Sequence, residues 1–127
     1  MKEIIIHNQQ LGEFNNNREL VEGTIRQINK DFASTGIQLP ESLGANVYQT
    51  IFETLRPLLE DLYENQLEKF YVLMYTVDAD RSKINRAFLK PTISLAYDEI
   101  TDLVIQREIL KVATRIWYKN QNTGRGI

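Results

Sequence analysis

The sequence contains no cysteine and only one histidine, His7, in 127 residues. The absence of cysteine excludes disulfide bonds within the chain, thiolate zinc sites and cysteine nucleophiles. A single histidine excludes most imidazole catalysis and most histidine metal sites. With three prolines and six glycines, the chain is also neither collagen-like nor dominated by loops.

Neither sign of charge is in large excess. Fifteen lysines and arginines stand against 17 aspartates and glutamates, which gives a net charge of −2. This balance argues against a dedicated binder of nucleic acid or other polyanions. The hydrophobic fraction of 43% argues against a disordered chain. We therefore expect residues 1–127 to form a single domain.

Long hydrophobic runs are missing too. The longest nearly unbroken apolar run is residues 70–77, whereas a helix that spans a membrane needs about 20 such residues. Residues 1–8 contain three isoleucines and then turn polar, which does not match a secretory signal peptide. We therefore expect a cytoplasmic protein without membrane contact.

Hydrophobic periodicity predicts a first helix over residues 17–33. Asn17 suits its N-cap, and Gly36 suits a left-handed conformation just beyond its end. The apolar side chains are spaced as on one helix face; they are Leu20, Val21, Ile25, Ile28 and Phe32. The opposite face carries charged residues, namely Arg18, Glu22, Arg26 and Lys30.

The strongest helical stripe follows over residues 47–62. Its apolar residues are Val47, Ile51, Phe52, Leu55, Leu58, Leu59 and Leu62. Pro57 falls inside this stripe, and a proline inside a helix removes one backbone hydrogen bond and clashes with the preceding turn. The sequence therefore predicts a kink or a break near residues 54–56.

Residues 67–77 allow two interpretations. Their aromatic and β-branched content favours a buried strand. The only segment available to pair with such a strand is residues 4–6, and a two-stranded sheet is marginally stable. The spacing of Leu67, Phe70 and Met74 also fits a helix, and we favour a buried helix here.

The remaining chain predicts two more helices. Asp80 is placed to cap a short helix that ends at residues 90–92 because of Pro91. The last helix is predicted over residues 92–120. It has apolar residues on two sides, which favours a central position; these are Ile93, Tyr97, Ile100, Leu103 and Val104 on one stripe, and Ile105, Ile109, Val112 and Ile116 on the other.

The predicted fold class is all-α, a compact bundle of four to five helices with the long C-terminal helix at its centre. Residues 1–15 are expected to form an N-terminal arm. Residues 121–127 are polar and contain glycine, so we expect a mobile tail.

Several acidic residues resemble metal ligands by their spacing. Asp78-x-Asp80-x-Ser82 matches the start of a calcium loop, but Lys83 and Leu89 stand where such a loop needs Gly and Glu. Asp98, Glu99 and Asp102 cluster near the start of the last helix, but the sequence lacks the Glu-x-x-His motif that a carboxylate metal site in a helical bundle usually adds. We interpret both groups as complements to helix N-termini. His7 is interpreted as an ordinary histidine. No metal or cofactor is predicted.

The most regular charge pattern is a basic row on the last helix. Arg107, Lys111, Arg115 and Lys119 follow one another at steps of four, with the aromatic residues Trp117 and Tyr118 beside them. These six residues are the candidate surface for an acidic protein partner, a phosphate or a nucleic acid. A structural alternative is that the acidic segment 41–69 packs against this helix and neutralises it. We favour the structural reading, then a protein partner, then nucleic acid.

Two segments together resemble small helical bacterial proteins of unknown function. The segments are Leu73-Met74-Tyr75-Thr76-Val77-Asp78 and Ile105-Gln106-Arg107-Glu108-Ile109-Leu110-Lys111-Val112-Ala113-Thr114-Arg115. The resemblance covers the C-terminal half of the chain and implies a helical fold in a bacterial cytoplasm, without any activity. It also implies a structural ion pair from Asp78 to Arg107, Lys111 or Arg115.

No catalytic signature stands out, so three hypotheses follow. The first is a non-enzymatic protein–protein interaction or accessory module, including self-association as a homodimer. The second is a nucleic-acid or phosphate-binding accessory protein that uses the basic face of the last helix. The third, least favoured, is a metal-dependent enzyme that uses Asp78, Asp98 or Asp102.

Overall fold

The computed structural model describes residues 13–125, with side chains as far as Gln121, and all regular structure in this part is helical. The elements are α2 (Arg18–Asp31), the 3₁₀ helix η1 (Ala33–Thr35), α3 (Val47–Asn65), α4 (Leu67–Val77), α5 (Arg81–Ala87) and α6 (Ile93–Arg125). The predicted all-α class is confirmed.

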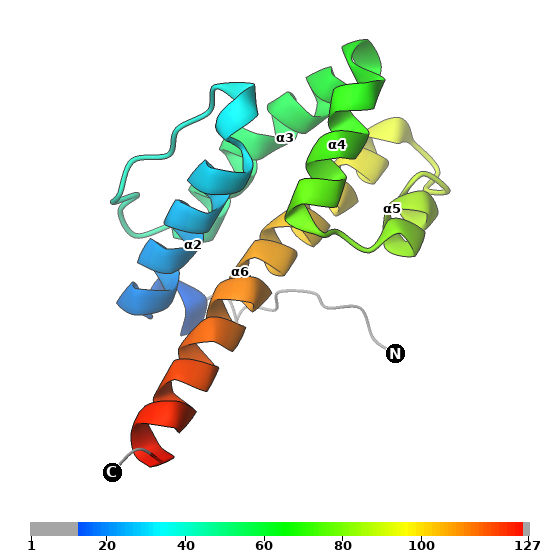
Figure 1. The fold of residues 1–127 in the computed structure, drawn as a ribbon. Coiled ribbons are helices and arrows are strands. Elements are labelled where there is room, and N and C mark those ends of the chain that lie inside the picture. The colour runs from blue at the N-terminus through cyan, green and yellow to red at the C-terminus, as the bar shows by residue number, and fades with distance from the viewer. Residues whose placement is uncertain (1–12, 126–127) are drawn as a thin grey trace.

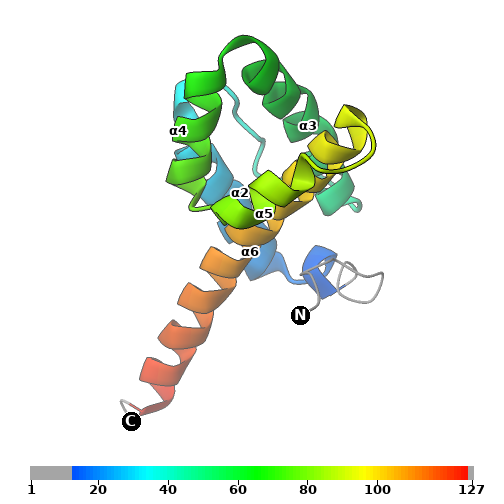
Figure 2. The same cartoon turned by 90° about the vertical axis from the view of Figure 1, so that its right-hand side faces the viewer.

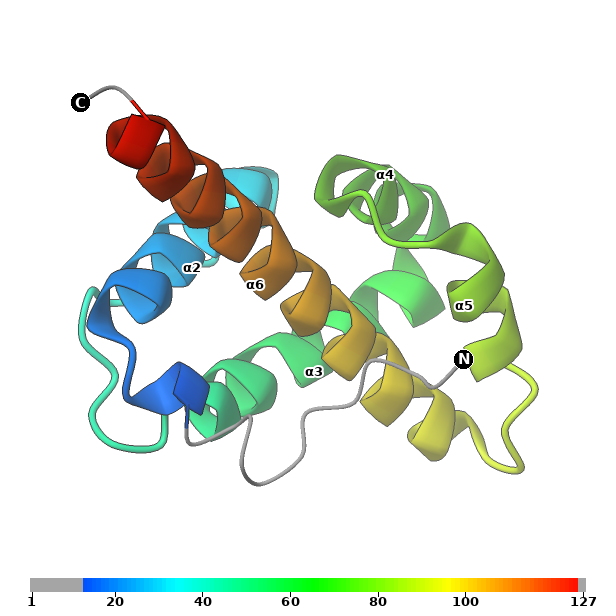
Figure 3. The same ribbon diagram turned by 90° about the horizontal axis from the view of Figure 1, so that it is seen from below.

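The long helix α6 is the centre of the arrangement, as predicted. It packs against α2, α3, α4 and α5. In Figure 1, α6 crosses the molecule diagonally, with α2 on one side and α4 and α5 on the other. Figure 3 shows the same order from below, with α3 crossing behind α6.

The core is built from the apolar stripes that the periodicity identified. It contains fully buried side chains from four helices, including Ile28 of α2 and its C-cap Phe32, Ile51, Leu55 and Leu59 of α3, Phe70 and Val77 of α4, and Ile100, Val104 and Ile105 of α6. Each such side chain contributes about 1.5–3 kcal/mol when it leaves water. Both stripes of α6 have buried members, which explains its central place.

The ends of α2 follow its local sequence. The side chain of Asn17 accepts a hydrogen bond from the backbone N–H of Leu20 over 3.1 Å and so caps the helix. After α2, the chain makes the short η1 turn and leaves it at Gly36, which has a φ of +83°. Both predicted roles are confirmed.

Pro57 does not break α3, so of the two outcomes predicted near residues 54–56, a kink or a break, the break is excluded. The helix runs without interruption from Val47 to Asn65. Ile51, Leu55 and Leu59 lie on both sides of Pro57 and are completely buried. Their burial, at about 1.5–3 kcal/mol each, outweighs the roughly 3 kcal/mol that a proline costs inside a helix.

Residues 67–77 form helix α4, which confirms the favoured interpretation and excludes the strand. The helix ends at Asp78, whose φ of +66° is left-handed. Asp80 then accepts hydrogen bonds from the N–H groups of Ser82 and Lys83 and caps α5, as predicted.

The structure differs from the predicted terminal segments in two places, at Phe14 and at the end of α6. Phe14, assigned to the N-terminal arm, is 3% exposed and packs edge-to-face against Tyr48, so it belongs to the core. Most of the arm lies outside the described residues. At the other end, α6 continues to Arg125 instead of ending near residue 120. The polar residues there are compatible with a helix, and Gly124 costs only about 1 kcal/mol.

Candidate functional site

Three of the four residues of the predicted basic row, Arg107, Lys111 and Lys119, contact acidic side chains of the protein itself. The guanidinium of Arg107 lies 2.6 Å from a carboxylate oxygen of Asp78, and its Nε donates to the backbone carbonyl of Asp78 over 3.0 Å. The structural ion pair expected for Asp78 is therefore confirmed, with Arg107 as its partner.

Lys111 is turned into the interface between α2 and α6. Its Nζ lies 2.7 Å from Asp31 Oδ2 and 2.8 Å from Glu108 Oε1. The Asp31 side chain is 7% exposed and Glu108 is completely buried. Burial raises the pKa of Asp31. Hydrogen bonds from neighbouring side chains, of which the bond from Lys111 has the largest effect, nevertheless hold this pKa below its usual value. Lys111 therefore stabilises the fold and does not offer its charge to a ligand.

The carboxylates that pair with the basic row do not come from residues 41–69, and this part of the structural alternative is wrong. They come from Glu19 and Asp31 on α2 and from Asp78 after α4, and the buried carboxyl group of Glu108 on α6 also contacts Lys111. The reason is geometric, because α3 packs on the N-terminal half of α6, where Arg56 of α3 pairs with Asp98.

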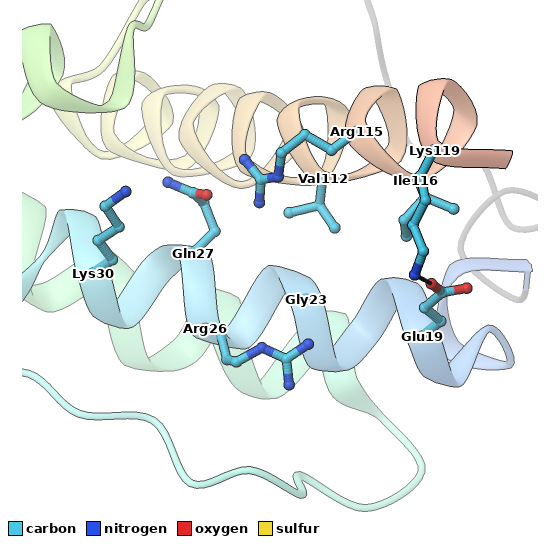
Figure 4. A pocket seen from close by; sticks show the side chains of 9 residues that line it. All are labelled: Glu19, Gly23, Arg26, Gln27, Lys30, Val112, Arg115, Ile116 and Lys119. Carbon is cyan, nitrogen blue, oxygen red and sulfur yellow. Dashed lines mark ion pairs between the residues drawn. The ribbon is translucent and has the colours of Figure 1, made fainter. Parts of the chain in front are cut away.

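The last two residues of the basic row, Arg115 and Lys119, line a groove between α2 and the C-terminal half of α6. The groove encloses about 580 Å³. Its walls are formed by Glu19, Gly23, Arg26, Gln27, Lys30, Val112, Arg115, Ile116 and Lys119. In Figure 4, Arg115 and Lys119 extend from α6 toward α2, and Arg26 forms the outer rim on the far side of α2.

The close approach of the two helices sets the floor of this groove. A Cβ atom on Gly23 of α2 would lie only 2.6 Å from Cγ1 of Val112 on α6. Real Cβ atoms do not come so close to another carbon, so the helices meet here because residue 23 has no side chain. Longer side chains of both helices line the groove around this contact.

The groove carries four cationic side chains and one carboxylate, Glu19. Glu19 lies 3.8 Å from Lys119 Nζ. Among the described residues, Arg26, Lys30 and Arg115 have no ion-pair partner.

The spacing of the four cations repeats on both helices. Arg26 and Lys30 are four residues apart on α2, and Arg115 and Lys119 are four apart on α6. Like charges at this spacing destabilise a helix by a few tenths of a kcal/mol, roughly 0.2–0.5 for each pair. The arrangement therefore costs some stability and produces a positive potential that attracts an anionic ligand.

The two aromatic residues of the predicted surface do not join the groove. Trp117 and Tyr118 are 55% and 58% exposed, and their rings contact each other edge-to-face at 4.9 Å. Trp117 follows Arg115 by two residues, which turns it about 200° around the helix axis. It therefore lies on the face of α6 opposite the groove.

The acidic residues considered as metal ligands are held by other side chains. Asp98 Oδ1 lies 2.5 Å from Nε of Arg56, and Glu99 pairs with Lys90 over 2.9 Å. Asp102 accepts a hydrogen bond from the Tyr48 hydroxyl, and burial raises its pKa above the usual value. Within residues 13–125, no three His, Asp or Glu side chains gather as a metal site would require.

Comparisons of this chain with protein-family models, with curated proteins and with solved structures find no match. The resemblance to small helical bacterial proteins thus stays an expectation from the sequence. Over the described residues, every helix is too short or too polar to cross a membrane. His7 lies outside the described residues.

Two contributors to the groove were missed as site residues by sequence reasoning. Arg26 and Lys30 were placed on the polar face of the first helix, but nothing in the sequence indicated that this face lies beside Arg115. The available signal was their spacing of four, the same as in the basic row. Glu108 was also missed, because a glutamate between apolar positions looks like an ordinary exposed residue.

Proposed function

We propose that this protein is a non-enzymatic interaction module that binds an acidic segment of a partner protein in the groove between α2 and α6. The observation that carries the proposal is the grouping of Arg26, Lys30 and Arg115, without ion-pair partners in the described chain, around one groove. A carboxylate-rich segment would replace repulsion between these cations with charge-assisted hydrogen bonds.

The size and charge of the molecule favour a protein segment over a nucleic acid. The net charge is −2, so the surface outside the groove repels an extended polyanion. The groove, at about 580 Å³, accommodates a few side chains rather than a long backbone. Trp117 faces away from it and cannot stack on a base that is bound there.

A phosphate-binding or nucleic-acid-binding role is the second candidate. Its support is that two of the groove cations are arginines, whose planar guanidinium groups bind phosphate with two hydrogen bonds.

The bacterial, cytoplasmic setting expected from the sequence is part of both proposals. So is the absence of catalysis, which is supported by the engagement of Asp98 and Asp102 in contacts within the fold.

The test measures binding of a fluorescently labelled oligoglutamate peptide by anisotropy. The groove variant is Lys30→Gln combined with Arg115→Gln. The matched control is Lys69→Gln combined with Arg86→Gln, which removes one lysine and one arginine that are exposed, without ion pairs in the described chain, and distant from the groove. Two exposed charges contribute roughly 0.2–1 kcal/mol each, so we expect about two- to thirtyfold weaker binding for the groove variant alone.

Equal losses in both double variants would show that the peptide responds to overall charge, and the proposal would then be wrong. The same titration with single-stranded DNA separates the two candidates. Tighter binding of the DNA than of the peptide at the same salt concentration, lost in the groove variant only, would favour the second candidate.

A further inference from the structure

Three ionisable side chains meet in the closed interface between α2 and α6, beside the groove. Lys111 Nζ lies 2.7 Å from Asp31 Oδ2 and 2.8 Å from Glu108 Oε1, so one ammonium group is shared by two carboxyl groups. Glu108 is completely buried, and the Asp31 side chain is 7% exposed. With both carboxyl groups ionised, this interface would hold a net negative charge away from water. A single proton on Glu108 makes the cluster neutral, since Lys111 then balances Asp31.

Within the described chain, the charged groups that act most strongly on Glu108 come from α2 and α6. Burial has the largest effect and raises the pKa of Glu108 to about 8; Lys111 lowers this pKa, and Asp31 raises it. The buried residues of α4 and α5 are all apolar. The titratable residue buried on α3 is Tyr48, whose hydroxyl donates to Asp102. The proton on Glu108 is therefore lost just above neutral pH.

This cluster is connected to the wall of the groove. The side-chain amide of Gln27, which lines the groove, donates to Asp31 Oδ2 over 3.1 Å. Lys30 precedes Asp31 and lines the same groove, and Arg115 lies two turns beyond Glu108 on the same side of α6. In Figure 4, Gln27 and Lys30 extend from α2 toward α6. A charge that appears on Glu108 is thus added beside the wall that carries the cations.

The pair of helices that forms the groove has few other supports at this end of the molecule. The groove is lined by residues of α2 and α6. Figure 2 shows the C-terminal half of α6 extending beyond α3, α4 and α5. A second negative charge in the interface is relieved either when α2 and α6 move apart or when a cation of the groove turns toward it. Both changes lower the affinity of the groove for an anionic ligand.

We propose that the proton held by Glu108 beside Asp31 controls how tightly the groove binds its acidic segment, an inference that rests on the function proposed above. The segment binds tightly while Glu108 is protonated. When Glu108 gives its proton to water, two carboxylates face the single ammonium group of Lys111, and the segment is bound more weakly. The cluster therefore makes binding in the groove sensitive to pH.

The test measures binding of the labelled oligoglutamate peptide at about pH 7 and about pH 9, at one ionic strength and on either side of the pKa of Glu108. The peptide carboxylates are ionised at both values. We expect roughly three- to tenfold weaker binding at the higher pH, the effect of one added charge near the site. Glu108→Gln keeps the shape of the protonated group and should bind equally at both. Glu68→Gln, at an exposed position on α4, is the matched control and should keep the full change.

Proton uptake gives a second, independent measurement. If loss of the proton weakens binding, then binding must favour the protonated form, and the complex takes up protons near the pKa of Glu108. Isothermal titration calorimetry in two buffers with different ionisation enthalpies measures this uptake. We expect a fraction of one proton for each peptide bound by the unmodified chain, and a clearly smaller uptake for Glu108→Gln. A purely structural role of Glu108 would leave the two uptakes equal.

The Asp31→Asn variant tests the sharing of Lys111. Without the carboxylate of Asp31, Lys111 faces Glu108 alone, and the cluster is neutral when Glu108 is ionised. The pKa of Glu108 then falls, so we expect the change in affinity to move to lower pH. A change that stays at the same pH would contradict the shared proton. Circular dichroism at each pH confirms that each variant is folded.

Failure of this inference is distinguishable from failure of the proposed function. Binding that is equal at the two pH values, or a change that persists in Glu108→Gln, would overturn the inference and leave the proposed function standing. Absence of binding at either pH would overturn the proposed function, and this inference with it.

Discussion

Glu108 carries a carboxyl group into the closed interface between α2 and α6. Neither of its oxygens has a hydrogen-bond partner of good geometry among the described residues, although Lys111 Nζ lies 2.8 Å from Oε1. Burial raises the pKa of Glu108 to about 8, against the opposing effect of Lys111, and the carboxylate of Asp31 adds to the rise. At neutral pH this carboxyl group is therefore mostly protonated, and Lys111 balances the charge of Asp31.

This raised pKa makes the free energy of unfolding depend on pH. The carboxyl group titrates near its usual pKa of 4.5 when the chain is unfolded and near 8 when it is folded. Between these values the folded state holds a proton that the unfolded state has lost, so stability falls as the pH rises. The loss of stability builds up as the pH rises from 4.5 to about 8 and levels off at higher pH. The depressed pKa of Asp31 acts in the opposite direction, and only at more acidic pH.

We expect the Glu108→Gln variant to lose most of this pH dependence. The amide keeps the shape of the protonated carboxyl group and does not titrate. The slope of the unfolding free energy between about pH 5 and about pH 8, at most about 1.4 kcal/mol per pH unit for one group, should become much smaller. Urea denaturation at several pH values measures it. Glu68→Gln, at an exposed position on α4, is the control and should leave the slope unchanged; an unchanged slope in Glu108→Gln would contradict the assignment.

At the scale of the elements, the contact between α2 and α6 depends on residue 23. We expect Gly23→Ala to destabilise the protein, although alanine is the better helix former by about 1 kcal/mol. Its Cβ would lie 2.6 Å from Cγ1 of Val112, a β-branched side chain with little freedom to move. Overpacking of this kind costs about 1–3 kcal/mol.

A double-mutant cycle with Val112→Ala measures this effect. In the Val112→Ala background the obstructing methyl group is gone, so Gly23→Ala should become neutral or stabilising. Thermal denaturation of the four proteins gives the coupling energy. If Gly23→Ala alone raised the stability by the full helix-propensity gain, the helices would not be in the described contact.

The elements also show how far the sequence could predict this structure. Asn17, Gly36 and Asp80 act within a few residues of their own positions, so local patterns were enough to place them. Continuation of α3 through Pro57 depends on burial against other helices, which local rules do not contain.

The candidate site was predictable only in part for the same reason. The basic row was visible at once, but its division into paired and unpaired residues depends on contacts between distant segments. Lys111 bonds Asp31 across 80 positions, and Arg115 shares its groove with Arg26. Neither relation leaves a periodic signal in the sequence.

The described part of the molecule is organised around α6, since α2, α3, α4 and α5 all pack on it. Val112 is the last fully enclosed apolar residue on this helix as far as Gln121. We expect a chain that ends at Asn120 to keep its melting temperature within about 3 °C. A chain that ends at Arg107 lacks Lys111 and Val112, and we expect it not to fold. Circular dichroism melting curves check both, and a folded shorter chain would contradict the central role of α6.

The pairing of α2 with α6 also has a consequence during synthesis on the ribosome. The apolar face of α2 is translated early, but its main partner is translated last, and the Asp31–Lys111 bond spans 80 positions. At about 5–20 residues per second, the nascent α2 waits several seconds for that partner. During this interval Ile25, Ile28 and Phe32 have no final packing site, and they are the natural target for a chaperone that shields hydrophobic surface.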